Sequence, residues 1–179
     1  CGADSPNTLY GNIPSIPPMP VPAPIESPLS ERELVLVRET DVPAAKLYAG
    51  WTQPDLVVQW FTPKPWATVS AEMDLRPGGR CNTTMRSPEG QDFPNKGIFL
   101  EVVPNEKIVF TDAYFENWEP NPNPFFTGIV TFETLPNGKT RYTARARHWT
   151  QENCEKHAAM GFLDGWGTAF DQLVGLMSK

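Results

Sequence analysis

The sequence predicts an α+β domain in which a curved antiparallel sheet lies against a long C-terminal helix. Segments with the alternation and turn residues of β-strands run from Ala67 to Phe115, and an amphipathic helical segment covers residues 157–173. One helix laid over a curved sheet encloses a hollow rather than a solid core. This order of elements therefore favours a protein that holds something apolar.

The first 29 residues form a separate zone. They contain eight of the 20 prolines, and each proline fixes φ and removes an N–H donor. We expect an extended, polyproline-like arm over residues 1–29, followed by one domain over residues 30–179. The arm is either a docking segment or tether, or an extension that buries its spaced aliphatic residues along its own domain.

The domain begins with a strand and two short helices. Residues 33–40 are rich in branched side chains and predict a strand. Asp41 is a candidate N-cap for a helix over residues 44–51, and a second helix is expected over residues 55–60.

Six further strands complete a seven-stranded antiparallel sheet. They are expected over residues 67–75, 80–86, 96–103, 107–115, 126–135 and 139–149. The turn Pro77-Gly78-Gly79 supplies positive φ for a tight hairpin, and residues 88–90 open a longer loop. Residues 117–124 are too long for a tight hairpin and predict an irregular flap over a cavity mouth.

The C-terminal segment predicts one long helix. Thr150 is its candidate cap, and apolar or small residues recur at helical spacing from Cys154 to Met177. Glycines such as Gly161 and Gly165 lie within this pattern, although glycine destabilises a helix interior by about 1 kcal/mol relative to alanine. Close approach to the sheet, or room for a ligand, explains their presence.

Strand alternation predicts which side chains face inward. The inward set comprises Val69, Ala71, Met73, Leu75, Cys81, Thr83, Met85, Val130, Phe132, Tyr142, Ala144, Ala146 and His148. Methionine, cysteine, threonine, tyrosine and histidine are mixed here with aliphatic residues. Such a mixture is typical of a cavity floor for a mostly apolar ligand with one or two polar anchors.

The charge argues against a nucleic-acid surface. Phosphate binding requires clustered lysine and arginine, whereas this chain of 179 residues has a formal net charge of -6. The local basic cluster, Arg141, Arg145 and Arg147, alternates along one predicted strand and is expected on a solvated face.

The cysteines predict neither a disulfide framework nor a zinc site. Cys1, Cys81 and Cys154 are odd in number and have no paired spacing, so a reducing, cytoplasmic location is the simplest interpretation. Cys1 with its proline-rich sequel also looks like the start of a mature periplasmic lipoprotein anchored through that residue, although a trimmed or engineered start explains it equally. No apolar run approaches the ~20 residues that span a bilayer.

Three segments carry a resemblance to a known family. They are MDLRPGGRCNTTMRSPEG from Met73, GIFLEVVPNEKIVFTDA from Gly97 and HAAMGFLDGWGTAFDQL from His157. Together they resemble the SRPBCC (START-like) superfamily over residues 33–179, and within it the bacterial AHSA1-type branch. The resemblance implies a helix-grip fold, with a seven-stranded sheet curled around the C-terminal helix and a deep cavity between them.

Functions in this superfamily range from lipid and polyketide binding to aromatic cyclisation and co-chaperone contact. Single-domain bacterial members lack the separate N-terminal domain through which the eukaryotic co-chaperone contacts its partner. This chain has the proline arm in that position, which argues against contact with the heat-shock chaperone.

The candidate ligand-binding residues are mostly aromatic. They are Trp66, Met73, Met85, Tyr114, Trp118, Phe132, His148, Phe162 and Trp166. His148 is the candidate catalytic residue, as a general base, and is equally interpretable as a ligand anchor or a buried histidine satisfied by backbone. His157 lies on the helix stripe, with a role at the cavity entrance or in packing.

The favoured hypothesis is a binding domain for a small lipophilic or aromatic molecule, with Tyr114 or His148 adding a hydrogen bond. One alternative is a cyclase- or hydrolase-like enzyme using His148 with a carboxylate. The other is a protein-interaction module that uses the proline arm and the Trp118 loop, for example to form a homodimer. No metal-ligand pattern such as H-E-x-x-H occurs, so neither a metal nor a cofactor is expected.

Overall fold

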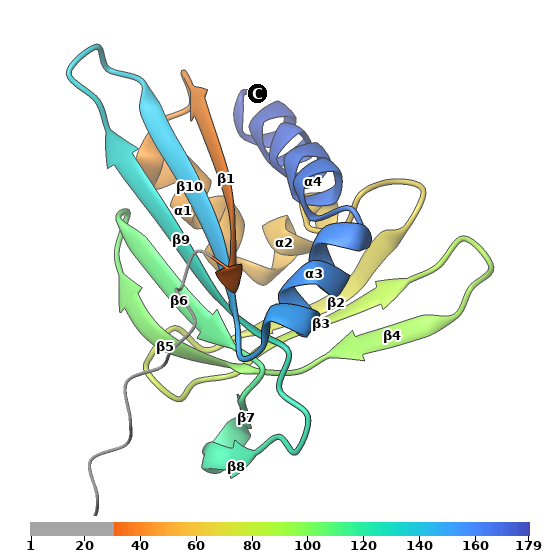
Figure 1. The fold of residues 1–179 in the computed structure, drawn as a ribbon. Coiled ribbons are helices and arrows are strands. Elements are labelled where there is room, and N and C mark those ends of the chain that lie inside the picture. The colour runs from red at the N-terminus through yellow and green to blue at the C-terminus, as the bar shows by residue number, and fades with distance from the viewer. Residues whose placement is uncertain (1–30) are drawn as a thin grey trace, which may run out of the picture.

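A computed structural model describes residues 31–179 (Figure 1). The elements follow in the order β1 (Glu33–Thr40), α1 (Ala44–Thr52), α2 (Pro54–Trp60), β2 (Ala67–Met73), β3 (Cys81–Arg86), β4 (Asp92–Asn95), β5 (Ile98–Val103), β6 (Lys107–Thr111), β7 (Tyr114–Phe115), β8 (Glu119–Pro120), β9 (Phe126–Thr134), β10 (Thr140–His148), α3 (Gln151–Ala159) and α4 (Phe162–Met177). This is the predicted α+β class with antiparallel strands and helices. The predicted arm over residues 1–29, with Cys1, lies outside the described residues.

The strands form two larger sheets that diverge from one another. One has the order β1-β10-β9-β6-β5 and the other the order β2-β3-β4, while β7 and β8 make a small hairpin. The two sheets meet where the Cys81 N–H donates to the Gly97 carbonyl at 3.0 Å and Arg80 forms an isolated bridge with Ile98. Helices α3 and α4 lie in the angle between the sheets (Figure 1).

Gly97 lies at the junction between β5, which occupies most of the strand predicted over residues 96–103, and β4, which was not predicted. A Cβ on Gly97 would overlap the carbonyl oxygen of Thr111, so only glycine lets these two backbones approach. On one side of it lies β4, in a segment that the sequence assigned to a loop. All four residues of β4 are exposed and one is Pro94, so this edge strand carries no alternating hydrophobic signal.

A bulge in β2 corrects the predicted inward face of this strand. The register with β3 shifts between Thr68 and Ser70. Thr68 is buried as a result, whereas Val69, predicted to face inward, is exposed. Leu75, also predicted to face inward, is exposed because β2 ends at Met73. A bulge adds one residue and so reverses the alternation on which the prediction depended.

The C-terminal helix is two helices. The Asn153 N–H donates to Thr150 Oγ1 at 3.1 Å, so the predicted cap is confirmed. Helix α3 then ends at Ala159, and Gly161 has a φ of 87°, which begins α4 in a new direction. Gly161 is therefore a joint rather than a helix-interior residue. Within residues 31–179 no helix combines the length and apolar character needed to cross a membrane.

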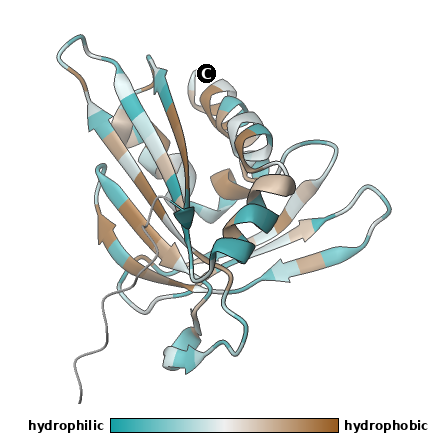
Figure 2. Ribbon diagram, in the orientation of Figure 1, coloured by the Kyte–Doolittle hydropathy of each residue, from teal (hydrophilic) through white to brown (hydrophobic). Residues whose placement is uncertain are grey.

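The solid core lies between α1, α4 and the five-stranded sheet. Leu36, Leu47, Val130, Ala144 and Leu173 are almost completely buried there. Each large aliphatic side chain contributes about 1.5–3 kcal/mol through burial. Figure 2 shows hydrophobic residues along β1, β5, β6 and β9 and in bands on α4.

The basic cluster on β10 is neutralised by neighbouring glutamates. Arg145 Nη1 and Arg147 Nε donate to the two carboxylate oxygens of Glu33 at 2.6 and 2.7 Å. Burial alone would raise the pKa of Glu33, but the hydrogen bonds and charges of both arginines hold it below its usual value.

Candidate functional site

A cavity of about 860 Å³ lies between the two sheets and helices α2, α3 and α4. This volume falls within the usual range of small-molecule sites. Aromatic side chains dominate its walls: Trp51, Trp60, Phe61, Trp66, Phe99, Phe110, Phe115, Phe125, Phe126, Tyr142, Phe162 and Trp166.

One wall is a continuous row of rings. The ring centroids of Trp51 and Phe110 are 5.7 Å apart, those of Phe110 and Phe126 are 6.0 Å apart, and those of Phe126 and Trp166 are 5.9 Å apart. The Phe110 ring lies across Gly128, its partner residue on β9, where a Cβ would overlap the ring. The glycine therefore fixes where this wall lies.

Asp112 positions two of these aromatic residues. Its carboxylate accepts from the backbone N–H groups of Phe125 at 2.9 Å and Phe126 at 3.2 Å, at the start of β9. Partial burial raises the pKa of Asp112, and the two backbone hydrogen bonds oppose that shift. Burial also raises the pKa of the Cys81 thiol to about 12, so this wall group is not a nucleophile at neutral pH.

A pair of histidines lies at the α3 side of the cavity. His148, on β10, is 3% exposed, and its Nδ1 is 3.0 Å from the carbonyl oxygen of Arg32. Its Nε2 is 2.9 Å from Nδ1 of His157, which borders the cavity. Burial, aided by the neighbouring His148, lowers the pKa of His157 to about 4.

The surroundings of His148 differ from those of a catalytic base. The enzyme hypothesis requires a carboxylate within hydrogen-bond reach of this ring. Its two ring nitrogens instead face the Arg32 carbonyl and His157. Among residues 31–179 there is also no cluster of three or more histidine, cysteine or acidic side chains placed to hold a metal ion.

Trp51 brings a buried donor to the cavity. Its Nε1 has no hydrogen-bond partner among the described residues, whereas Trp60 Nε1 donates to the Gly50 carbonyl at 2.8 Å. Burial raises the pKa of the Tyr142 phenol, and the nearby Trp51 indole partly opposes this rise. The geometry of the two side chains does not form a hydrogen bond.

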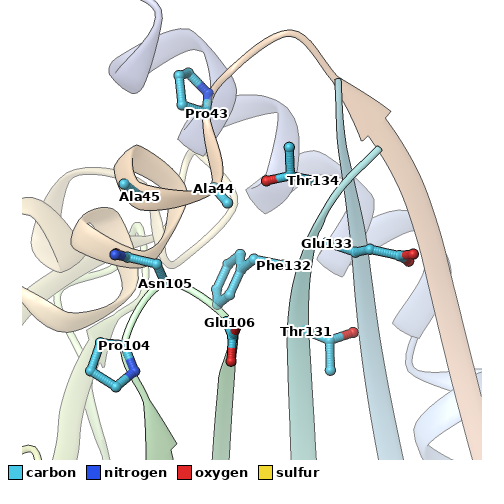
Figure 3. Close-up of a pocket in the computed structure, with 10 residues that line it drawn as sticks. All are labelled: Pro43, Ala44, Ala45, Pro104, Asn105, Glu106, Thr131, Phe132, Glu133 and Thr134. Atoms are coloured by element: carbon cyan, nitrogen blue, oxygen red, sulfur yellow. The ribbon is translucent and has the colours of Figure 1, made fainter. Parts of the chain in front are cut away.

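The structure brings five of the predicted ligand-binding residues to the cavity: Trp66, Met73, Met85, Phe162 and Trp166. His148 lies behind His157 rather than on the wall. Phe132 is buried beneath α1, beside a separate hollow that Ala44 and Glu106 also line (Figure 3).

Tyr114 and Trp118 lie outside the cavity. Their rings form an edge-to-face pair with centroids 5.9 Å apart on the β7–β8 hairpin. The Trp118 ring covers Gly78, where a Cβ would come within 2.6 Å of it. The predicted flap therefore packs on the hairpin turn at residues 77–79.

Four residues of the aromatic wall were not expected from the sequence: Trp51, Phe110, Phe115 and Phe125. Two of them carried a usable signal. Trp51 is four residues after the buried Leu47 on α1, and Phe110 is two residues after the buried Ile108 on β6.

An antiparallel sheet closed by C-terminal helices around an apolar cavity defines the class of helix-grip domains. Residues 41–178 match the family model described as Activator of Hsp90 ATPase homolog 1-like protein, and the chain belongs to this family.

Solved structures carry the same fold. A crystal structure of a protein from Nitrosomonas europaea is 41% identical with a TM-score of 0.79, and the match covers 83% of this chain and 96% of that one. A protein from Mycobacterium smegmatis is 24% identical with a TM-score of 0.69, over 83% and 92% of the two chains. The AHSA1 protein from Silicibacter pomeroyi is 20% identical with a TM-score of 0.63, over 82% and 97%. No curated protein sequence matches the chain.

Proposed function

We propose that this protein binds a small lipophilic or aromatic molecule in the cavity between its sheets and C-terminal helices. The observation that carries the proposal is the cavity of about 860 Å³ with its aromatic walls. Burial of apolar ligand surface contributes about 25 cal/mol per Å², and planar rings gain further from edge-to-face contacts.

The rim of the cavity supports entry of an apolar molecule. Met160, at the end of α3, borders the cavity and is 71% exposed. Trp66 also borders the cavity, is partly exposed and packs against Phe93 with ring centroids 5.4 Å apart. Residues that are both exposed and on the wall mark the opening, and they include the flexible Met160 and the aromatic Trp66 beside Pro94, Asn95 and Lys96.

The first test is native mass spectrometry of protein purified from its own host, followed by denaturing extraction. We expect one small apolar molecule per chain. Recovery of a protein partner in place of a small molecule would favour the interaction module instead.

A matched pair of glycine variants tests whether the ligand binds in this cavity. Gly165 borders the cavity and a Cβ there meets nothing within 4 Å, while Gly175 lies on the exposed face of the same helix with equal space. We expect Gly165→Leu to fill part of the cavity and weaken binding of 2-naphthol by about tenfold or more, which corresponds to about 1.4 kcal/mol.

Gly175→Leu is the control, because it makes the same change of helix propensity away from the cavity. Isothermal titration calorimetry should give it the affinity of the unmodified protein. Equal affinities for both variants, or no binding of the probe to the unmodified protein, would contradict a ligand site in this cavity.

A further inference from the structure

The histidine pair has a fixed direction of hydrogen bonding. A carbonyl oxygen can only accept, so the contact of 3.0 Å with Arg32 requires His148 Nδ1 to carry a hydrogen. The Nε2 of a neutral His148 is then an acceptor, and at 2.9 Å it receives the hydrogen of His157 Nδ1. In this tautomer His157 Nε2 keeps its lone pair.

The surroundings of His157 keep the ring neutral. Its centroid lies 5.1 Å from those of Phe125, Phe126 and Phe162, and no described residue forms a hydrogen bond with its Nε2. Burial lowers its pKa to about 4, so the imidazole is uncharged at neutral pH. A neutral histidine on an aromatic wall thus leaves an unused acceptor beside the cavity.

Two charged residues line the cavity: Lys96 is exposed to solvent, whereas Asp112 is half-buried. The Asp112 carboxylate borders the same cavity and is held by the backbone of Phe125 and Phe126, whose rings contact His157. An anionic head group near His157 would face the Nε2 lone pair, and the half-buried Asp112 carboxylate on the same cavity would repel it. A neutral head group with a hydrogen to donate meets two acceptors instead.

We propose that the ligand is a neutral aromatic molecule with a hydroxyl group, which donates its hydrogen to His157 Nε2. This inference rests on the proposed function and specifies the chemistry of the ligand at the same site. His148 acts as a positioning residue, because its bond to the Arg32 carbonyl selects the tautomer of His157.

Three probes with the same ring system test this chemistry at pH 7. They are 2-naphthol, its methyl ether 2-methoxynaphthalene, and the anion 2-naphthoate. We expect 2-naphthol to bind about tenfold more tightly than the methyl ether, since it alone donates a hydrogen bond. We also expect 2-naphthoate to bind more weakly than 2-naphthol.

The variant His157→Phe removes the acceptor and keeps a ring of similar size. In this variant 2-naphthol should lose its advantage, while the affinity for 2-methoxynaphthalene stays within about twofold, since that probe makes no bond to Nε2. A variant that lost affinity for both probes equally would overturn the assignment to His157.

A measurement on the unmodified protein complements the variant. His148 and His157 are the two histidines of the chain, so nitrogen NMR of their side chains is directly assignable. We expect His157 Nε2 to be unprotonated at pH 7 and to shift when 2-naphthol binds. A protonated Nε2 would overturn the proposal.

The outcomes separate this inference from the proposed function. Equal binding of 2-naphthol and its methyl ether, or tightest binding of 2-naphthoate, overturns the hydroxyl donor and leaves the lipophilic site intact. Binding of none of the three probes counts against both.

Discussion

Burial of the His157 imidazole links the stability of the fold to pH. Its pKa falls from an ordinary 6.5 to about 4 in the folded protein, so the unfolded chain takes up a proton first on acidification. The free energy of unfolding should therefore decrease between pH 6.5 and pH 4. At about 1.4 kcal/mol per pKa unit, reduced for solvent screening at the cavity edge, the expected loss is about 2 kcal/mol. Urea unfolding at pH 7 and pH 4.5 measures it.

The same titration on His157→Phe is the control. This variant should lose most of the decrease between pH 6.5 and pH 4. Asp112 acts in the opposite direction, because burial raises the pKa of its carboxyl and the folded state then binds that proton more tightly. An unchanged pH dependence in the variant would assign the effect to other groups.

For single residues, the sequence predicts which face of a strand a side chain occupies. It predicts less well whether that face borders the cavity or the solid core. Met73 and Met85 border the cavity because strand alternation places them inward. Phe132 obeys the same alternation, yet it meets α1 and the solid core, since the cavity lies under another part of the sheets. That difference depends on how α1 packs, which alternation does not encode.

The left-handed backbone of Gly161, between helices α3 and α4, predicts the stability of variants at this position. A Cβ at this residue meets nothing within 4 Å, so Gly161→Ala should cost only the strain of a left-handed backbone, about 1–2 kcal/mol. Asparagine tolerates this conformation better, so Gly161→Asn should lose less. Thermal unfolding with van't Hoff analysis compares the two.

Gly165→Ala serves as the reference in the same helix. It has equal space and a helical backbone, so it should gain about 0.5–1 kcal/mol. If Gly161→Ala gained stability by the same amount, α3 and α4 would be one continuous helix in solution, as the sequence predicted.

Helical periodicity alone could not reveal this joint. The apolar spacing continues from α3 into α4, and glycine is compatible with both helical and left-handed backbone. A single residue with a φ of 87° changes the direction of the helix without interrupting its pattern. The Thr150 cap, in contrast, was predictable because it depends on one side chain and a neighbouring N–H.

The division of the molecule into two sheets depends on Gly97. Its φ is ordinary for any residue, so Gly97→Ala should destabilise through the collision with the Thr111 carbonyl alone. We expect a loss of about 3 kcal/mol in the free energy of unfolding, because the added Cβ would meet the backbone of Thr111 and Asp112, which cannot yield as a side chain would. Urea unfolding at neutral pH measures this loss.

Gly175→Ala provides the comparison, since its Cβ enters open space on α4. It should be as stable as the unmodified protein or slightly more stable. A Gly97→Ala variant that matched it would show that the sheets can separate at this junction without loss.

Alternation and turn residues within short windows of sequence predict the α+β class, the tight turns and most strand positions. The junction between the sheets does not, because Gly97 and Thr111 are distant in sequence and meet only after folding. The β2 bulge at Thr68–Ser70 and the exposed strand β4 escape prediction for a related reason, since neither carries a regular hydrophobic period.

The position of the tryptophans gives the protein a built-in optical reporter. Trp51, Trp60, Trp66 and Trp166, four of the six in the chain, border the cavity, while Trp118 and Trp149 are exposed outside it. A molecule that enters the cavity contacts this group of indoles and changes their emission, while the two exposed indoles supply a constant background. Fluorescence can therefore follow the filling and emptying of the cavity in real time, without any label.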